Sequence, residues 1–308
     1  MPTPQEIKSS LHRDGFVVIP SVLSESELSA LRAAATRTTA RARSGAWPHI
    51  RTLGKQFPPW SAADIHKGIW GVQHLLHPDL PPDDAAVFTR SYFHPRILDT
   101  AALLIDGGGD GGGEEGGEGG GGGDQLVMEL YNMLVRPDAD YELRWHRDDV
   151  PPEATAEQEM SRLGRPAWHA QWNLALWDDE SLVVVPGSHL RARTDAERAA
   201  DPFARELPGQ LVVRLRPGDV AFYNNNILHR GVYDSARERM TLHGSVGHAG
   251  GSKLRARNVL QHGVGEWVER CDFSVLEDGA QRARAEGMRQ RLIKLGRESG
   301  DVGYSLKD

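Results

Sequence analysis

The sequence predicts a mainly β fold with flanking helices, either a sandwich or a barrel. From residue 126 onward the chain is a series of short β-rich runs, separated by turn sequences at intervals of roughly ten residues, which is typical of sandwiches and barrels. Before residue 106 the pattern differs, with helical periodicity and a long proline-rich stretch. A chain of 308 residues is ample for one buried core, and we expect a single domain over residues 1–308.

Composition excludes several classes of protein. Hydrophobic residues make up 39% of the chain, and no run of about eighteen apolar residues is available for a membrane-spanning helix. The start, MPTPQEIKSS, lacks the basic and then apolar pattern of a secretory signal. Cys271 is the only cysteine, which excludes an internal disulfide and a cysteine-based metal site. We therefore expect a cytoplasmic protein with no membrane partner.

An acidic glycine-rich run occupies residues 106–124. It consists of thirteen glycines and six acidic residues. Such a segment cannot bury apolar surface, so we expect a disordered surface loop inserted between two elements. Its six acids account for all but one unit of the net charge of −7, so the rest of the chain is close to neutral. A near-neutral chain offers no basic patch, which argues against a nucleic-acid partner.

The N-terminal part predicts one strand and one helix. Residues 14–20 form a short apolar run that ends at Pro20. Ser24, followed three residues later by Glu27, is a capping box that marks the start of a helix. An apolar face continues this helix at Leu28, Leu31 and Ala35.

Residues 45–100 are rich in proline and predict loops. We assign Trp47, Trp60 and Trp70 to packing, although this stretch could also wrap the open end of the core and line a substrate pocket. Residues 91–105 predict a helix that Pro95 interrupts near its start.

The remaining elements follow the glycine-rich run. Strands are predicted over residues 126–136, 141–148, 167–177, 182–185, 210–215, 220–223 and 239–245. A C-terminal helix is predicted over residues 277–299, with a packing face at Ala283, Met288, Leu292 and Leu295.

The tripeptide His146-Arg147-Asp148 is the first candidate for chemistry. Residues two apart on a strand point to the same side, so His146 and Asp148 can aim at one metal ion. Two histidines and one carboxylate, with open positions left over, are the ligands of non-haem Fe(II) oxygenases. The His-x-Asp pattern also occurs at residues 12–14 and 77–79, where a turn sequence predicts no common direction for the two side chains.

Five motifs in order resemble the phytanoyl-CoA dioxygenase family, over most of residues 10–250. They are His146-x-Asp148, Pro186-Gly187-Ser188-His189, Pro217-Gly218-Asp219, His229-Arg230-Gly231 and Arg239-Met240-Thr241. The apolar run at residues 14–20, followed by a helix, is similar to the N-terminal signature of that family. The resemblance implies a double-stranded β-helix, which is a cupin-like jelly roll, and Fe(II)/2-oxoglutarate-dependent chemistry. The acidic glycine-rich run and residues 45–100 depart from the family pattern.

The resemblance also implies the roles of individual residues. His229 becomes the third iron ligand, beside His146 and Asp148. Arg239, ten residues after His229, becomes the anchor for the far carboxylate of 2-oxoglutarate, with Thr241 beside it on the same strand face. Arg237 shares that face and is the competing anchor. The weaker candidates for contact with 2-oxoglutarate or substrate are Asn132 and Asn173.

These expectations imply an oxygenase that consumes dioxygen and 2-oxoglutarate and releases succinate and carbon dioxide while it oxidises a small organic substrate. The carboxylate of Asp148 favours hydroxylation, or a related oxidation, over halogenation, because the iron halogenases that resemble this family lack it. A cupin-like metalloenzyme that does not use 2-oxoglutarate stays open, as does a non-catalytic binding protein. A kinase is excluded because position 153, where the catalytic loop needs asparagine, is Glu153. Both a monomer and a homodimer are compatible with the sequence.

Overall fold

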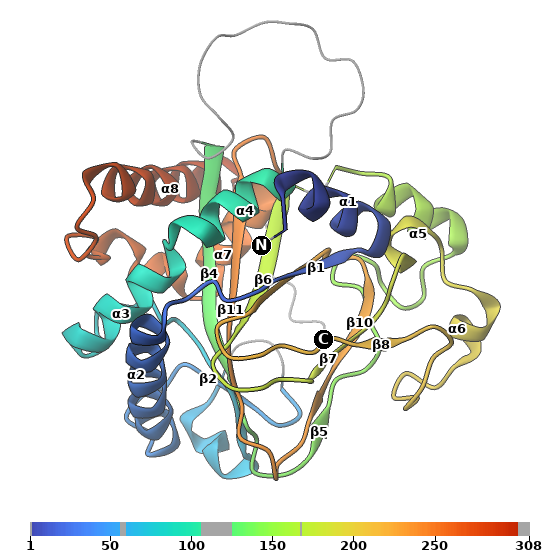
Figure 1. Cartoon of the computed structure of the whole chain (residues 1–308), viewed down its shortest axis with the longest axis horizontal. Helices are drawn as coiled ribbons and strands as arrows, with labels where there is room; N and C mark the ends of the chain where they lie inside the picture. Colours follow the sequence, from blue (N-terminus) through green and yellow to red (C-terminus); the bar gives the residue numbers. More distant parts are fainter. Residues whose placement is uncertain (1, 56–59, 106–124, 167, 301–308) are drawn as a thin grey trace, which may run out of the picture.

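The computed structural model describes residues 2–55, 60–105, 125–166 and 168–300. The acidic glycine-rich run at 106–124, which we expected to be disordered, lies outside these residues. Two antiparallel sheets form the centre of the molecule (Figure 1). From β4 to β11 the chain passes repeatedly from one sheet to the other, as expected for a double-stranded β-helix.

The larger sheet has seven strands, in the order β1-β9-β6-β11-β4-β3-β2. Their bounds are β1 (Phe16–Ile19), β2 (Ile50–Thr52), β3 (Ile69–Val72), β4 (Leu126–Val135), β6 (His169–Ala175), β9 (Val220–Tyr223) and β11 (Met240–His248). The smaller sheet has the order β5-β10-β7-β8. Its strands are β5 (Tyr141–Glu142), β7 (Leu182–Val185), β8 (Leu211–Val212) and β10 (Leu228–Tyr233).

Helices cover the outer face of the larger sheet (Figure 1). On that side lie α2 (Glu25–Arg43), α3 (Pro82–Tyr92), α4 (Pro95–Ile105), α7 (Lys253–Gln261) and α8 (Gly279–Glu298). The helix α1 (Pro4–Asp14) packs beside β1, while α5 (Ala156–Leu163) and α6 (Asp195–Ala199) lie near the smaller sheet. In the part of the chain that the structure describes, no helix is long and apolar enough to cross a membrane.

Strand alternation divides the larger sheet into a packing face and an inner face. Trp172 on β6 is fully buried and lies 5.7 Å from the ring of Tyr92 on α3. Gly244 on β11 is its direct partner, and a side chain there would collide with the indole because a Cβ would lie 2.2 Å from it. The neighbours of Trp172 along β6, Gln171 and Asn173, therefore point to the opposite face, between the two sheets.

Several helices were not predicted from the sequence. The helix α1 begins with a capping box at Thr3 and Glu6 that we did not use, and α3 lies in the stretch that we predicted as loops. In α5 a second unused capping box joins Thr155 to Gln158. The helix predicted over residues 91–105 is confirmed from Pro95 to Ile105 as α4, but its start was wrong, because residues 91 and 92 belong to the end of α3. On α8, Ala285 is buried where we expected Ala283.

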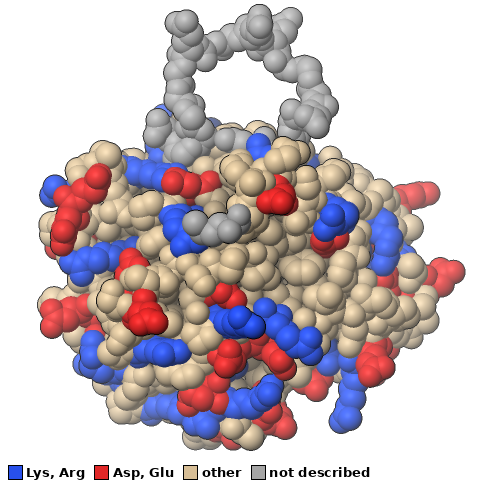
Figure 2. Space-filling model, in the orientation of Figure 1, with Lys and Arg blue, Asp and Glu red and all other residues tan. Residues whose placement is uncertain are grey.

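The charged side chains on the face seen in Figure 2 are of both signs and are interspersed over the elements. Several of them are paired across elements, for example Arg284 on α8 with Asp99 on α4 at 2.7 Å. Such pairs on the surface contribute little to stability individually.

The cap of α2 provides a test of the local sequence signal. The Ser24 side chain accepts a hydrogen bond from Glu27 N at 3.3 Å, and Ser24 N donates to the Glu27 carboxylate at 2.8 Å. Ser24→Ala should lower the free energy of unfolding by about 1 kcal/mol in urea titrations, because one donor at the helix start loses its acceptor. Thr36→Ala, at an exposed position of the same helix, is the control and should cause no loss. Equal stability of Ser24→Ala and the wild type would contradict this reading of the cap.

Candidate metal centre

Two distant chain segments meet at the smaller sheet. His229 is the second residue of β10, and His146 forms an isolated bridge with it beyond the end of β5. His146 N donates to His229 O at 2.9 Å, and His229 N donates to His146 O at 3.0 Å. The continuous strand that we expected over residues 141–148 was wrong, because only β5 and this bridge pair regularly.

Both imidazoles keep the same nitrogen available. Nδ1 of His146 lies 2.7 Å from the carbonyl of Arg144, and Nδ1 of His229 lies 2.8 Å from the carbonyl of Ile227. A carbonyl accepts only, so Nδ1 of each neutral ring carries the proton and Nε2 keeps its lone pair. The two rings are neighbours, with centroids 4.3 Å apart.

Asp148 completes the group. Its Oδ1 lies 3.6 Å from Nε2 of His146 and 3.8 Å from Nε2 of His229. The three potential ligand atoms all lie within 4.8 Å of one another. Gln171 on β6 donates to Oδ2 of Asp148 at 3.1 Å and holds the carboxylate from the other sheet. The structure thus brings together the three residues that the sequence singled out as metal ligands.

The protonation states of this group suit a cation. Burial lowers the pKa of His229 to about 4, so its ring is neutral at neutral pH. Desolvation alone raises the pKa of Asp148, but His229, His146 and the hydrogen bond from Gln171 bring that pKa below its ordinary value. Neutral imidazole and ionised carboxylate are the forms that bind metals.

A cavity of about 90 Å³ lies against the three residues. In its wall, Asn173 Oδ1 lies 2.8 Å from His243 Nδ1. Asn132 on β4 is the direct partner of His243 in the sheet register and so points to the same inner face. Its Oδ1 accepts from His74 N at 3.1 Å, while its buried Nδ2 has no partner among the described residues. Both predicted asparagines therefore face the space between the sheets.

Arg239 and Thr241 are buried behind Ser181 and Tyr233, which line the same cavity. Nη2 of Arg239 donates to Ser181 Oγ at 3.0 Å and to Thr241 Oγ1 at 2.8 Å. Its Nε donates to Asp179 Oδ2 at 2.7 Å. Nη1 is buried and finds no hydrogen-bond partner within the part of the chain that the structure describes.

The competing arginine and the His-x-Asp copy at residues 77–79 have local roles, and the copy at residues 12–14 lies at the end of α1. Arg237 is exposed and pairs with Glu180 at 3.1 Å. His77 Nδ1 accepts from Asp79 N at 3.0 Å inside its own turn. Nε2 of His189 lies 3.0 Å from the carbonyl of His12 on α1, so this ring belongs to a structural contact.

Sequence reasoning missed Asp179, Gln171, Ser181 and His243. Nothing local marks Asp179 as the partner of a residue sixty positions away. Gln171 and His243 carried a usable signal, because each lies two residues from a singled-out position on the same strand, Asn173 and Thr241 respectively.

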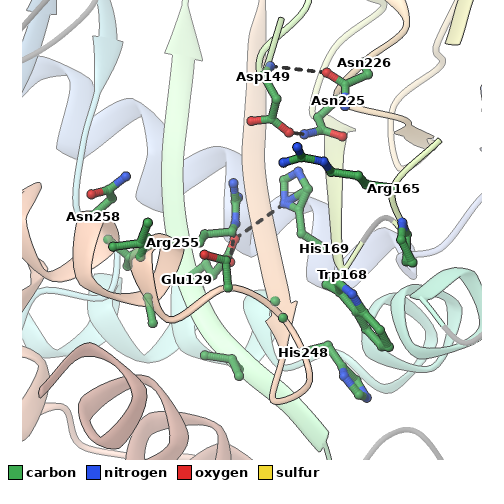
Figure 3. A pocket seen from close by; sticks show the side chains of 18 of the residues that line it. Glu129, Asp149, Arg165, Trp168, His169, Asn225, Asn226, His248, Arg255 and Asn258 are labelled. Atoms are coloured by element: carbon green, nitrogen blue, oxygen red, sulfur yellow. Dashed lines mark hydrogen bonds and ion pairs between the residues drawn. The ribbon is translucent and has the colours of Figure 1, made fainter. Parts of the chain in front are cut away.

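A second, larger cavity of about 680 Å³ opens at the end of the barrel near His169 and Trp168 (Figure 3). Its lining combines β4, β6, the end of β11 and α7 with the loop at residues 224–226. Asp149, next to the metal-ligand candidate Asp148, belongs to this lining and is held by Asn225 and Asn226. The large cavity is therefore lined by the residue that follows the metal-ligand candidate Asp148 in the chain.

The buried pair of Asp179 and Arg239 provides a test of the inner end of the site. Asp179→Asn should lower the free energy of unfolding of the metal-free protein by about 3 kcal/mol, because it leaves the buried guanidinium uncompensated. Burial raises the pKa of Asp179, but Arg239 outweighs it and brings that pKa below the ordinary 3.8. The contribution of the ionised Asp179 to the free energy of unfolding is thus present above about pH 4 and is lost as the pH falls further.

The matched control is Asp178→Asn, one residue earlier and exposed, which should change the stability by less than about 0.5 kcal/mol. Chemical denaturation at pH 7 and pH 3.5 measures both effects. Equal stability of the two variants at pH 7, or an undiminished gap between them at pH 3.5, would contradict the assignment.

Comparison with known proteins places this geometry in a family. The family model for phytanoyl-CoA dioxygenase matches residues 11–240. No curated protein sequence matches the chain significantly.

Solved structures share the fold at low sequence identity. AviO1 from Streptomyces viridochromogenes Tue57 is 19% identical with a TM-score of 0.53, over 80% of this chain and 96% of that one. EctD from S. alaskensis, solved with 2-oxoglutarate and 5-hydroxyectoine, is 19% identical with a TM-score of 0.54, over 81% and 77% of the two chains. The α-ketoglutarate-dependent epimerase SnoN from nogalamycin biosynthesis is 22% identical with a TM-score of 0.50, over 80% and 81%. With the family model covering most of its length, the chain belongs to the phytanoyl-CoA dioxygenase family of non-haem Fe(II)/2-oxoglutarate-dependent oxygenases.

Proposed function

We propose that the chain oxidises a small organic substrate at an iron(II) ion held by His146, Asp148 and His229. The observation that carries this proposal is the convergence of two Nε2 atoms and one carboxylate oxygen within 4.8 Å. The carbonyls at Nδ1 fix both rings with the lone pair of Nε2 directed away from the backbone. Two imidazoles and one carboxylate leave open positions on iron(II), which oxygenases of this type require.

Arg239 would bind the far carboxylate of 2-oxoglutarate. Its buried Nη1 has no acceptor among the residues that the structure describes, and a carboxylate is the acceptor that a guanidinium matches best. The hydroxyls of Ser181 and Thr241 accept from the neighbouring Nη2 and donate to Asp179, so they help to hold the guanidinium in place. Asp179 holds Nε and so orients the guanidinium without using Nη1. A cupin-like enzyme that does not use 2-oxoglutarate would leave this donor without a role.

Iron and 2-oxoglutarate, when bound, supply the oxidation, in which dioxygen is consumed and the keto acid is cleaved to succinate and carbon dioxide. The chain positions and shields this chemistry. Gln171 keeps the Asp148 carboxylate in place, and Asn173 fixes the His243 ring in the cavity wall. Aromatic side chains, Trp70, Tyr223 and Tyr233, exclude water from the small cavity.

The substrate would enter through the large cavity. Its volume of about 680 Å³ lies within the range of sites for small organic molecules. The small cavity, of about 90 Å³, is lined by the three metal-ligand candidates, so it would hold the metal ion and not the substrate. EctD, which shares the fold, was solved with 2-oxoglutarate together with 5-hydroxyectoine, a small organic molecule.

The iron ligands can be tested by anaerobic titration of the Fe(II)-loaded protein with 2-oxoglutarate, which gives a weak visible charge-transfer band. The wild type should develop the band, and His229→Ala should not, because two of the protein donors cannot hold the ion in the required geometry. His189→Ala, which removes a histidine with a structural contact, is the control and should retain the band. Iron bound to the wild type without a band would contradict the use of 2-oxoglutarate.

The 2-oxoglutarate anchor can be tested in the same titration. Thr241→Val removes one buried hydroxyl that holds Nη2 of Arg239, with almost no change of shape, and should weaken the apparent affinity about five- to tenfold, which corresponds to the usual net contribution of one hydrogen bond. Arg239→Lys should weaken it further, since an ammonium cannot bind bidentately. Arg237→Ala, exposed and two residues away, should have no effect. A larger effect at Arg237 than at Arg239 would reverse the assignment.

A further inference from the structure

A second polar cluster lies at the large cavity, on the same strand face as the metal site. His169, Gln171 and Asn173 are spaced two apart on β6 and share its inner face. Gln171 touches the metal-ligand candidate Asp148, and Asn173 lines the small cavity. His169, at the outer end of this row, lines the large cavity instead. The row therefore runs from the metal side of the site to the space proposed for the substrate.

His169 has no hydrogen-bond partner of its own. Its side chain is only 7% exposed, yet neither ring nitrogen forms a hydrogen bond with any residue that the structure describes. Buried polar atoms in folded proteins are almost always satisfied, by protein, water or a ligand. His169 lines the large cavity, so a water or ligand that satisfies its ring nitrogens can reach it from there (Figure 3).

A buried carboxylate decides which nitrogen of His169 carries the proton. Glu129 on β4 lies 3.6 Å from Nδ1 of His169 and is held by Arg255 of α7 through two contacts of 2.5 and 2.7 Å. Burial alone raises the pKa of Glu129, but Arg255 and His169 bring it below its ordinary value, so the carboxylate is ionised. An anion beside Nδ1 favours the proton on that nitrogen and leaves Nε2 as an acceptor.

The cluster as a whole carries no net charge. Burial lowers the pKa of His169 to about 4, so the ring is neutral at neutral pH. Glu129 and Arg255 compensate each other in a two-point ion pair. Glu129 also lies close to β11, since a Cβ at Gly247 would lie 2.6 Å from one of its carboxylate oxygens.

The rest of the large cavity adds an aromatic surface and neutral polar groups. Trp168 is 41% exposed and stacks on His248 at 5.0 Å between ring centroids, which leaves one face of the indole toward the opening. Asn258 on α7 lies across from His169 (Figure 3). Figure 3 also shows the exposed Arg165 reaching over the His169 ring, so this long side chain is the part of the wall that must yield to a ligand.

We propose that His169 is the substrate-orienting residue, and that its Nε2 accepts a hydrogen bond from a hydroxyl group of a neutral, ring-containing substrate whose ring packs against Trp168. This inference rests on the proposed function, because it assigns the large cavity to the substrate of the oxygenase. A hydroxyl supplies the one donor that Nε2 needs. A cationic substrate would meet Arg255 and Arg165, and an anionic one would meet Glu129 and Asp149.

The tautomer of His169 provides the first test. Nitrogen NMR of histidine-labelled, metal-free protein at pH 7, assigned by the loss of one signal in His169→Phe, should show a neutral ring with the proton on Nδ1. Glu129→Gln, which removes the anion but keeps the shape, should shift the ring toward the other tautomer. A proton on Nε2 in the wild type, or a charged ring, would overturn the proposal.

Two matched probes provide the second test: trans-4-phenylcyclohexanol and its methyl ether, which keeps the ring system but has no donor. Ligand-detected NMR titrations should show the alcohol binding at least about five times more tightly than the ether, the usual cost of leaving a buried acceptor unpaired. His169→Phe should abolish this preference, and His66→Phe, at an exposed position outside the cavity lining, should keep it. No preference in the wild type, no binding of the alcohol, or a preference that survives in His169→Phe would overturn the proposal.

The iron and 2-oxoglutarate site and the role of His169 can be tested separately. His169→Phe should retain the charge-transfer band of the iron and 2-oxoglutarate complex, since the residue touches neither. If the wild type shows a normal charge-transfer band but the other tautomer of His169, or no preference for the alcohol, only the proposed role of His169 is contradicted. If the wild type shows no band but has the expected tautomer and alcohol preference, the proposed oxygenase function is contradicted, and the binding of a hydroxyl group in the large cavity still stands.

Discussion

The site depends on one pair of backbone hydrogen bonds, which joins His146 to His229 across the smaller sheet. These bonds place two imidazoles side by side although the residues are far apart in the chain. Each ring is then held at Nδ1 by a carbonyl two residues earlier, Arg144 or Ile227, so the backbone also selects the nitrogen that faces the site. Without the bridge, Asp148 would have no second histidine near it, and the convergence of ligand atoms would be lost.

The alternation of side chains along β6 and β11 connects this site to the rest of the molecule. One face of these strands carries Trp172 and packs against the helices, where apolar burial stabilises the fold. The other face carries Gln171 and Asn173 and serves the site. A shift of register by one residue would exchange the two faces. The packing of Trp172 against Gly244 fixes the register, and so it also keeps Gln171 and Asn173 on the side of the site.

Two buried ion pairs mark opposite ends of the space between the sheets. At one end Asp179 orients Arg239 and leaves one guanidinium nitrogen without a hydrogen-bond partner in the described part of the chain. At the other end Arg255 keeps Glu129 ionised beside His169. Buried pairs of this kind add little net stability, and a fixed orientation of groups is their better attested use. Each pair lies beside hydrogen-bonding capacity that finds no partner among the described residues, Nη1 of Arg239 behind the small cavity and the ring of His169 at the large cavity.

The sequence by itself determined the β-rich class, the helix start at Ser24 and the three potential metal ligands, because capping and strand alternation are local rules and the family motifs occur in a fixed order. It missed helices such as α3, whose proline-rich surroundings resemble loops, and it overestimated the strand leading to Asp148. Only the tertiary structure revealed the partnership of Asp179 with Arg239 and a His169 ring that has no hydrogen-bond partner among the described residues. Both depend on contacts between residues distant in the chain, and such contacts leave no periodic trace in the order of the amino acids.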